Sequence, residues 1–337
     1  MKSYHLQMGA GLGGITLREH AVPRPGPHEV LLRVRAASLN YRERMILEQG
    51  RYPLPVKPDV VGLCDGAAEV VELGAEVSRV KPGERVVASI FPFWRDGPFS
   101  LEVAAQLGGS LDGMLSEYVV LHEDAPLPIP AHLSWEEAAT LPCAGVTAWH
   151  ALQGGLPLRP GEDVLVLGSG SVSLFALQLA KVAGARVIAT TSSAVKAERL
   201  RALGADAVID YTATPAWAEA VRALTDGRGV RHVLEVGGAT FAQSLRAVAL
   251  GGEIALIGNL AGGEAQVDVA ALFASGAIVR PVAAGNRAQL AGLLQTFALH
   301  GLRPLIDRVF SFDEAAAAFA YYAEARVLGK VVIRMPD

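Results

Sequence analysis

The chain has 337 residues, of which 51% are hydrophobic and 19% charged, and its 36 glycines and 19 prolines indicate many tight turns rather than a helical bundle. This composition predicts a globular protein of two domains with large buried cores. Because 30 lysines and arginines stand against 34 aspartates and glutamates, the net charge of −4 argues against a protein that binds nucleic acid through bulk electrostatics.

The chain shows no targeting or membrane signal. Residues 1–17 lack an apolar core of signal-peptide length, and no stretch reaches the roughly eighteen apolar residues of a membrane helix. Its two cysteines, Cys64 and Cys143, cannot form a disulfide framework. We therefore expect a cytoplasmic protein with reduced thiols that does not bind membranes.

The N-terminal part alternates short runs of β-forming residues with turn residues. These runs cover 30–35, 60–73, 85–90 and 118–121. They predict an antiparallel, barrel-like domain.

The pattern changes after residue 130. Ser134 and Glu137 form a capping-box sequence that predicts the start of a helix, which Pro142 interrupts. From residue 163 a strand (VLVLG), a helix and a second strand (RVIATT) follow in order. The later predicted elements are strands at 207–210, 232–236, 253–257 and 277–282 and a helix at 216–224.

This alternation predicts a doubly wound α/β domain with a parallel sheet. A final helix at 288–299 and a strand at 330–334 are expected to return to the first domain. The predicted domains are therefore 1–130 with 288–337, and 131–287.

A glycine-rich turn is the strongest chemical motif. It reads Gly168-Ser169-Gly170-Ser171-Val172-Ser173, directly after an apolar strand and at the start of a helix. Gly168 permits the tight turn, Gly170 lets a pyrophosphate approach the backbone, and the helix N-terminus at Ser171 and Val172 offers N–H groups. Ser173 replaces the usual third glycine. The motif predicts dinucleotide binding, and the alternative is a glycine-rich turn without a ligand.

The residue that ends the second strand is expected to select the dinucleotide, because NAD-binding folds place an acid there against the ribose diol. Here it is Thr191. An acid would repel a 2′-phosphate by about 4 kcal/mol per charge pair at about 4 Å and an effective dielectric near 20. Ser192, Ser193 and Lys196 offer charge-assisted hydrogen bonds of about 1.5–3 kcal/mol each, which favours NADPH. Alternatively these residues only cap and solvate the next helix.

Several segments together resemble the medium-chain dehydrogenase/reductase superfamily, in particular its zinc-independent, quinone oxidoreductase-like and alcohol dehydrogenase-like members. They are SLNYRERM, GLCDGAAEVVELGAEVSRVKPGERVV, DGMLSEYV, EEAATLPCAGVTAW, VLGSGSVSLFALQLAKVAGARVIAT and the terminal GKVVIRM. The resemblance implies a GroES-like catalytic domain, a Rossmann domain, a cofactor in the cleft between them and a homodimer.

The resemblance also bears on zinc. At the positions that hold the catalytic zinc ligands in related alcohol dehydrogenases, this chain has Asn40, then Cys64 with Asp65, and then Cys143. A neutral amide is a poor zinc ligand, so we expect no metal, although Cys64 and Cys143 with a carboxylate from Asp65 or Glu43 would offer ligands. Otherwise the two thiols are small buried residues that line the substrate pocket.

The resemblance further implies cofactor contacts. Thr147 would lie behind the nicotinamide, and the backbone around Gly258 would receive its carboxamide. Ser192, Lys196 and Tyr211 match positions that contact a 2′-phosphate, and Lys330 matches a position near the pyrophosphate. From the residues alone, Tyr211 and Lys330 are equally compatible with packing or surface roles.

Without a metal, the site needs another way to stabilise charge on a substrate oxygen. Hydride delivery to a quinone or to the alkene of an α,β-unsaturated carbonyl spreads that charge into an enolate, which hydrogen-bond donors stabilise more easily. We expect Asn40 to donate through its amide and Tyr41 to donate a hydrogen bond or a proton. In the alternative, Asn40 fixes a turn and Tyr41 packs.

The segment FPFWRDGPF falls where relatives build part of the substrate pocket, so Phe93 and Trp94 are expected to line an apolar wall; otherwise they pin a loop to the core. The predicted function is an NADPH-dependent, zinc-independent reductase of quinones or conjugated enones. The alternatives are an alcohol dehydrogenase or carbonyl reductase for simple substrates, and a cofactor-binding structural or sensor protein without turnover.

Overall fold

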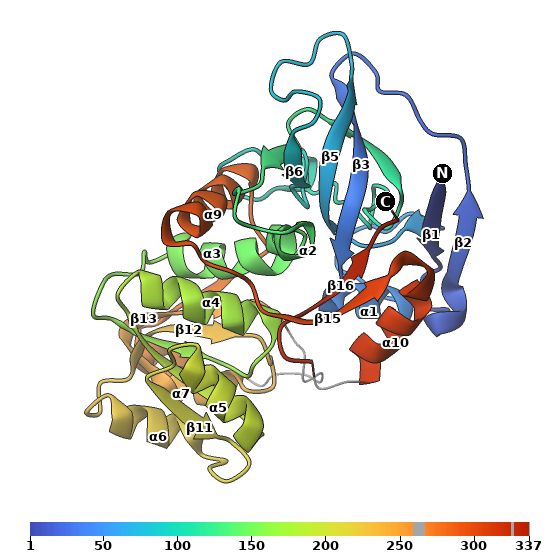
Figure 1. Cartoon of the computed structure of the whole chain (residues 1–337). Helices are drawn as coiled ribbons and strands as arrows, with labels where there is room; N and C mark the ends of the chain where they lie inside the picture. The colour runs from blue at the N-terminus through green and yellow to red at the C-terminus, as the bar shows by residue number, and fades with distance from the viewer. Residues whose placement is uncertain (259–266, 325–326, 337) are drawn as a thin grey trace. The chain divides into compact units, whose positions relative to one another are not determined.

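The computed structural model describes residues 1–258, 267–324 and 327–336, and within it the chain divides into two compact units (Figure 1). Unit 1 consists of Met1–Val146 and Gly285–Asp337, and unit 2 of Thr147–Ala284. None of the helices within the described residues is long and apolar enough to cross a membrane.

Unit 1 is built on a seven-stranded sheet with the order β15-β16-β3-β5-β6-β8, in which β7 also pairs with β3. Its strands are β3 (Glu29–Ser38), β5 (Asp65–Leu73), β6 (Arg85–Ala88), β7 (Tyr118–His122), β8 (Pro126–Pro128), β15 (Ile306–Ser311) and β16 (Lys330–Arg334). The β15–β16 pair is parallel, and the other pairs of the sheet are antiparallel. A smaller sheet holds β1 (Lys2–Leu6), β2 (Ile15–Glu19) and β4 (Val60–Val61). The antiparallel architecture predicted for the N-terminal part is confirmed.

The predicted single run at 60–73 is broken in the structure. β4 and β5 are separated by a bend in which Leu63 has a left-handed backbone, with φ of +62°. Hydrogen bonds from the backbone of 113–115 to the carbonyls of Val61, Gly62 and Leu63 hold the bend, at 2.7–3.0 Å. The bend turns the chain from one sheet to the other and places Cys64 immediately before β5.

Four helices and several single turns complete the described part of unit 1. They are α1 (Tyr41–Leu47), α2 (Trp135–Ala138), α9 (Arg287–His300) and α10 (Ala315–Glu324), with single turns at η1 (Gly11–Gly14), η2 (Leu101–Val103), η3 (Leu141–Gly145) and η4 (Phe312–Glu314). The capping box at Ser134 and Glu137 is present, and a π-helical turn with Pro142 in its first turn follows α2. Because α2 packs on β3, β5 and β16, residues 131–146 lie in unit 1 rather than with the nucleotide-binding unit, which differs from the predicted boundary.

Unit 2 is a six-stranded parallel sheet with the strand order β11-β10-β9-β12-β13-β14. The strands are β9 (Asp163–Val166), β10 (Arg186–Thr191), β11 (Ala207–Asp210), β12 (Val230–Glu235), β13 (Val248–Leu256) and β14 (Ile278–Pro281). The helices are α3 (Val146–Gln153), α4 (Ser171–Val182), α5 (Ala194–Ala202), α6 (Trp217–Leu224), α7 (Phe241–Ala247) and α8 (Val269–Ser275) (Figure 1).

In chain order this arrangement reads 3-2-1-4-5-6, the doubly wound order of dinucleotide-binding folds. Strand order reverses beside β9, and the glycine-rich turn follows this strand. The predicted Rossmann fold is therefore confirmed, and its ligand-binding edge is the carboxyl end of the strands.

Candidate active site

The glycine-rich turn has the backbone that its sequence predicts. Gly168 has φ of +75°, a conformation that L-residues rarely adopt, and Gly170 is the N-cap of α4. A Cβ built on either glycine meets no atom within 4 Å, so the space beside both is open. Ser171 and Val172 open a helix of 12 residues whose N-cap carries no side-chain hydrogen bond, which leaves its first N–H groups available to an anion.

Ser173 shows why a serine can stand at the third position of the motif. Its side chain is buried, and its hydroxyl donates to the carbonyl oxygen of Leu167 at 2.7 Å. This bond ties the first turn of α4 to the end of β9. The serine therefore replaces the close helix–strand packing of a glycine with a hydrogen bond.

The residues proposed for the 2′-phosphate follow the second strand. Thr191 ends β10 and is buried, Ser192 and Lys196 are half-buried, and Tyr211 is 41% exposed. Ser193 is the N-cap of α5 and accepts a hydrogen bond from the backbone of Lys196 at 3.4 Å. The capping interpretation thus holds for Ser193.

Two further predicted cofactor contacts lie in unit 2. Thr147 is a buried residue in the first turn of α3. Gly258 is the last described residue before 259–266, and its N–H donates to the carbonyl oxygen of Glu235 at 3.4 Å. The Gly258 backbone is therefore held at the carboxyl end of β12.

Glu235 is a residue of this edge that the sequence reasoning missed. Its carboxylate is buried and accepts hydrogen bonds from Gly237, Gly238, Thr240 and Ser244. These hydrogen bonds to a carboxylate are charge-assisted, and together they fix the turn after β12. The signal was the sequence EVGG, in which the acid ends a strand and a Gly-Gly pair begins two residues later.

In unit 1, the predicted catalytic residue Asn40 lies in a buried polar cluster. Asn40 is the N-cap of α1 and is 5% exposed. Its Nδ2 donates to Asp65 Oδ2 at 2.9 Å and lies 3.6 Å from Cys64 Sγ, and its Oδ1 accepts from Lys330 Nζ at 2.6 Å. Because lysine only donates and a carboxylate only accepts, these two partners fix which end of the amide faces which way.

Lys330 belongs to the same buried polar cluster. Its side chain is 1% exposed, and its ammonium donates to Leu39 O at 2.7 Å, to Asn40 Oδ1 at 2.6 Å and to Asp65 Oδ2 at 3.1 Å. An ammonium has three hydrogens, and these partners account for all of them. The structure therefore holds the Lys330 ammonium inside unit 1, and the contact with a pyrophosphate stays a prediction.

Tyr41 begins α1 beside this cluster. Its side chain is half-buried, and its hydroxyl accepts a hydrogen bond from Gln49 Nε2 at 3.4 Å. The guanidinium of Arg44 lies 5.8 Å from its ring centroid. The hydroxyl therefore retains its own hydrogen for donation.

Three ionisable groups that the sequence reasoning did not single out lie near the predicted thiols. Burial raises the pKa of Tyr52 and, further, that of Tyr322, and Cys143 interacts electrostatically with both. The guanidinium of Arg42 lies 4.9 Å from the ring centroid of Tyr52 and donates to Glu43 at 3.1 Å. Both phenols are thus kept in the protonated form that can donate a hydrogen bond.

The aromatic segment divides into a buried and an exposed part. Trp94 is 2% exposed, its ring meets those of Phe91 and Phe99 edge to face, and its Nε1 donates to Gly97 O at 3.0 Å. Phe93 is 48% exposed, and its ring centroid is 6.4 Å from that of His122. Trp94 thus pins the loop to the core, while Phe93 presents an apolar surface.

Among the described residues, one group of three potential metal ligands occurs, formed by Cys64, Asp65 and Cys143, whose ligand atoms lie within 4.8 Å of one another. Burial raises the pKa of the Cys64 thiol well above its usual range, whereas zinc binds the thiolate. The Oδ2 atom of Asp65 accepts hydrogen bonds from Ser38, Asn40 and Lys330. An ammonium beside the cluster and a neutral amide in place of a ligand do not fit a zinc ion.

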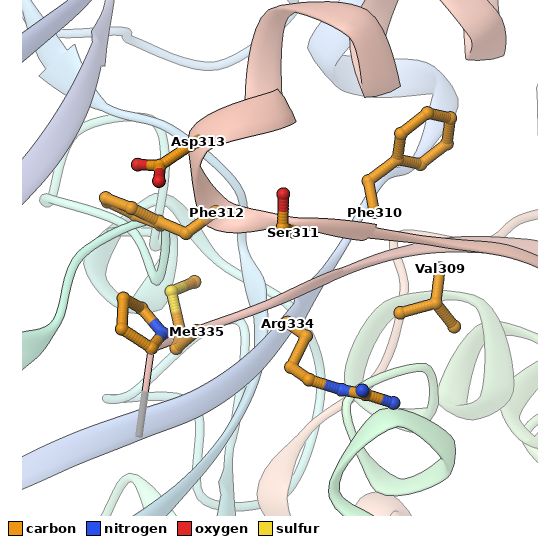
Figure 2. A pocket seen from close by; sticks show the side chains of 8 residues that line it. Val309, Phe310, Ser311, Phe312, Asp313, Arg334 and Met335 are labelled. Carbon is orange, nitrogen blue, oxygen red and sulfur yellow. The ribbon is translucent and has the colours of Figure 1, made fainter.

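A groove of about 330 Å³ lies elsewhere in unit 1. It is lined by Val309, Phe310, Ser311, Phe312, Asp313, Arg334, Met335 and Pro336. Figure 2 shows Phe312 and Met335 at one end of it and Val309 at the other. No predicted site residue lines this groove.

Comparison with known proteins places both units in described families. Residues 26–131 match the alcohol dehydrogenase GroES-like domain, and residues 171–298 match the zinc-binding dehydrogenase family. A zinc-type alcohol dehydrogenase-like protein of Schizosaccharomyces pombe is 38% identical over 97% of this chain and 96% of its own length. A quinone oxidoreductase of Pseudomonas aeruginosa is 34% identical over 96% of this chain and 97% of its own length.

A solved structure agrees with these relationships. A crystal structure from Sinorhizobium meliloti 1021, described as an alcohol dehydrogenase, has a TM-score of 0.91 and 40% identity and covers 99% of this chain and 98% of its own. The two domain families, the full-length relatives and the strand order agree. The chain belongs to the medium-chain dehydrogenase/reductase superfamily of NAD(P)-dependent oxidoreductases.

Proposed function

We propose that this oxidoreductase reduces quinones or α,β-unsaturated carbonyl compounds with NADPH and without a catalytic zinc. The observation that carries the proposal is the amide of Asn40, which stands where related enzymes have a metal ligand and whose orientation Lys330 and Asp65 fix. A preorganised N–H donor stabilises developing negative charge without reorganisation.

A bound NADPH would supply the hydride. Addition of that hydride to the β-carbon of an enone converts the carbonyl oxygen into an enolate oxygen. The Asn40 amide can donate a hydrogen bond to this oxygen. One Nδ2 hydrogen of Asn40 is held by Asp65, and the other points toward Cys64 at the long distance of 3.6 Å. A substrate oxygen would accept this second hydrogen in place of the weakly bonding sulfur.

The reaction also consumes a proton. We propose that the Tyr41 hydroxyl donates a hydrogen bond to the enolate or delivers this proton, directly or through a water. The hydroxyl accepts from Gln49 at 3.4 Å and keeps its own hydrogen. With a quinone the same hydride and proton give a hydroquinone.

The preference for NADPH rests on charge in unit 2. Thr191 ends β10 where NAD-binding folds carry an acid, and Ser192 and Lys196 follow it. The one nearby carboxylate on the adjacent strand, Asp210, accepts two hydrogen bonds from Thr212, at 2.9 and 2.7 Å. A lysine and hydroxyl groups at this position favour a cofactor with a 2′-phosphate.

Two relatives support the substrate class. The protein from Pseudomonas aeruginosa is named a quinone oxidoreductase, and an acryloyl-coenzyme A reductase of Metallosphaera sedula is 30% identical over 95% of this chain. Both names describe reduction of a conjugated acceptor. In such a reduction the negative charge is delocalised, so a hydrogen-bond donor can stabilise it without a metal.

The experiment is a panel of acceptors with NADPH oxidation as the readout. The panel pairs each quinone or enone with the saturated aldehyde or ketone of matching size. The proposal expects turnover of the conjugated member of each pair and little of the saturated one. Equal or faster turnover of saturated aldehydes would favour an alcohol dehydrogenase, and NADPH binding without any turnover would favour a binding protein.

We further propose that the protein forms a homodimer through unit 2. β14 ends the strand order of the parallel sheet, and exposed apolar side chains occur on neighbouring segments: Leu250 is 78% exposed, Phe273 89% and Ile278 47%. Open strand edges and apolar patches favour association. Sedimentation velocity tests this proposal, and Phe273→Glu is expected to shift a dimer toward monomer.

A further inference from the structure

Two thiols lie close together in unit 1, and no step of the proposed reaction uses them. Cys64 and Cys143 are the two cysteines of the chain, and their Sγ atoms lie within 4.8 Å of one another. We propose that they form a reversible disulfide when the protein meets a two-electron oxidant such as hydrogen peroxide. The pair would then be a site of oxidative modification.

A disulfide requires the two sulfurs at about 2.0 Å, so both side chains must turn toward each other. Cys64 lies in the bend between β4 and β5, and Cys143 lies in the π-helical turn η3. Neither residue belongs to a strand, so this movement breaks no strand pairing.

The two thiols differ in access, which sets the order of events. Cys64 is fully buried, whereas Cys143 is partly exposed. An oxidant from solvent therefore reaches Cys143 first. Cys64 is the second thiol, protected from direct attack but close enough to react with an oxidised neighbour.

The chemistry balances in two steps. The Cys143 sulfur attacks one oxygen of hydrogen peroxide, the O–O bond breaks, and a sulfenic acid and one water form. The Cys64 sulfur then attacks the Cys143 sulfur, the S–S bond forms, and the hydroxyl leaves with the Cys64 proton as a second water. Two thiols lose two electrons and two protons, and the peroxide is reduced to two waters.

The disulfide would reach the candidate catalytic residue. Cys64 Sγ lies 3.6 Å from Asn40 Nδ2, so turning this sulfur toward Cys143 changes the surroundings of the amide. Oxidation is therefore expected to lower turnover, and a reductant to restore it. This consequence depends on the proposed function, whereas the disulfide itself does not.

The test counts thiols in the intact protein. The wild-type chain is treated with hydrogen peroxide or with diamide, denatured in iodoacetamide, and measured by intact mass and peptide mapping without reduction. We expect loss of two hydrogen atoms, no alkylation, and one peptide pair that joins Cys64 to Cys143. Treatment with dithiothreitol after oxidation and before alkylation should restore alkylation of both cysteines.

The single variants Cys64→Ser and Cys143→Ser provide the matched controls, since neither can form the intrachain bond. The proposal would be overturned if both cysteines can still be alkylated after oxidation. It would also be overturned if Cys143 carries oxygen adducts while Cys64 can still be alkylated, or if disulfides form only between chains. Peptide mapping of the wild type decides the matter even if a variant does not fold. Because the readout is thiol chemistry, these outcomes leave the proposed reductase activity untouched.

Discussion

The ammonium of Lys330 donates a hydrogen bond to the side-chain oxygen of Asn40 at 2.6 Å, across 290 residues of sequence. The same ammonium pairs with Asp65, whose carboxylate in turn accepts from the Asn40 amide. These three groups form a closed ring of charge-assisted hydrogen bonds. The ring gives Asn40 one orientation and supplies a buried positive charge beside it.

Replacement of Asn40 tests its role as a donor. Asn40→Ala removes the N–H that would face a substrate oxygen, and loss of one such donor lowers kcat by about 100- to 1,000-fold in other enzymes. Steady-state NADPH oxidation with the best enone or quinone measures the effect.

The matched control is Asn286→Ala. Asn286 also caps a helix in unit 1, since its side chain accepts from the backbone of Gln289 at 2.8 Å. Loss of this cap is expected to lower the free energy of unfolding by about 1 kcal/mol and to leave kcat unchanged. If Asn40→Ala retains wild-type kcat, Asn40 is a structural cap only.

Replacement of Lys330 tests the buried ion pair. Lys330→Met leaves the Asp65 carboxylate buried without its cation, which is expected to lower the free energy of unfolding by about 3–5 kcal/mol. The double variant Lys330→Met/Asp65→Asn removes the uncompensated charge and should recover much of this loss. Urea denaturation measures both.

A lysine–aspartate pair at the surface provides the comparison. Lys57 Nζ lies 2.6 Å from Asp112, and the two side chains are 39% and 49% exposed. Lys57→Met should therefore change the free energy of unfolding by less than about 1 kcal/mol. Equal losses for Lys57→Met and Lys330→Met would contradict the structural role assigned to Lys330.

The sequence could predict the elements around this cluster but not the contacts within it. Hydrophobic periodicity and the glycine-rich turn predicted the parallel sheet, because the buried face of each strand and helix is visible in the spacing of its own apolar residues. By contrast, the hydrogen-bond partner of a buried polar side chain depends on which strands pair in the folded chain. Lys330 reaches Asn40 because β16 pairs with β3, the strand that leads into Asn40, and no local pattern contains that pairing.

The break at Leu63 was missed for a related reason. Residues 60–73 read as one β-rich run, since valine pairs stand near both of its ends and mark them as extended. Hydrogen bonds from 113–115, some fifty residues later, hold the left-handed bend instead. The sequence therefore identified candidate catalytic positions but not the geometry that sets their contacts.

The cofactor preference can be tested at Lys196. Lys196→Ala removes a charge-assisted hydrogen bond to a 2′-phosphate, which should weaken NADPH binding by about ten- to hundredfold and leave NADH binding nearly unchanged. The ratio of kcat/KM values for the two cofactors is the measurement. Lys181→Ala, which removes a surface ion pair with Asp206 in the same unit, should leave the ratio as it is. A ratio equally unaffected in Lys196→Ala would argue for a role in the helix alone.

The two glycines of the motif should respond differently to alanine. Gly168→Ala forces a side chain onto a backbone with φ of +75°, so stability should fall by about 1–2 kcal/mol. Gly170 has φ of −73° and open space around it, so Gly170→Ala should fold with nearly wild-type stability. The added methyl would occupy the approach of the pyrophosphate and weaken NADPH binding, measured by fluorescence titration. Unchanged binding in Gly170→Ala would place the pyrophosphate elsewhere.

The most direct test of the account is turnover by metal-depleted protein. The purified chain is dialysed against a chelator, its metal content is measured, and NADPH oxidation is followed with an enone or quinone. We predict undiminished turnover without bound metal, and transfer of deuterium from labelled NADPH to the β-carbon of the enone. A stoichiometric transition metal whose removal abolishes turnover and whose return restores it would contradict the account.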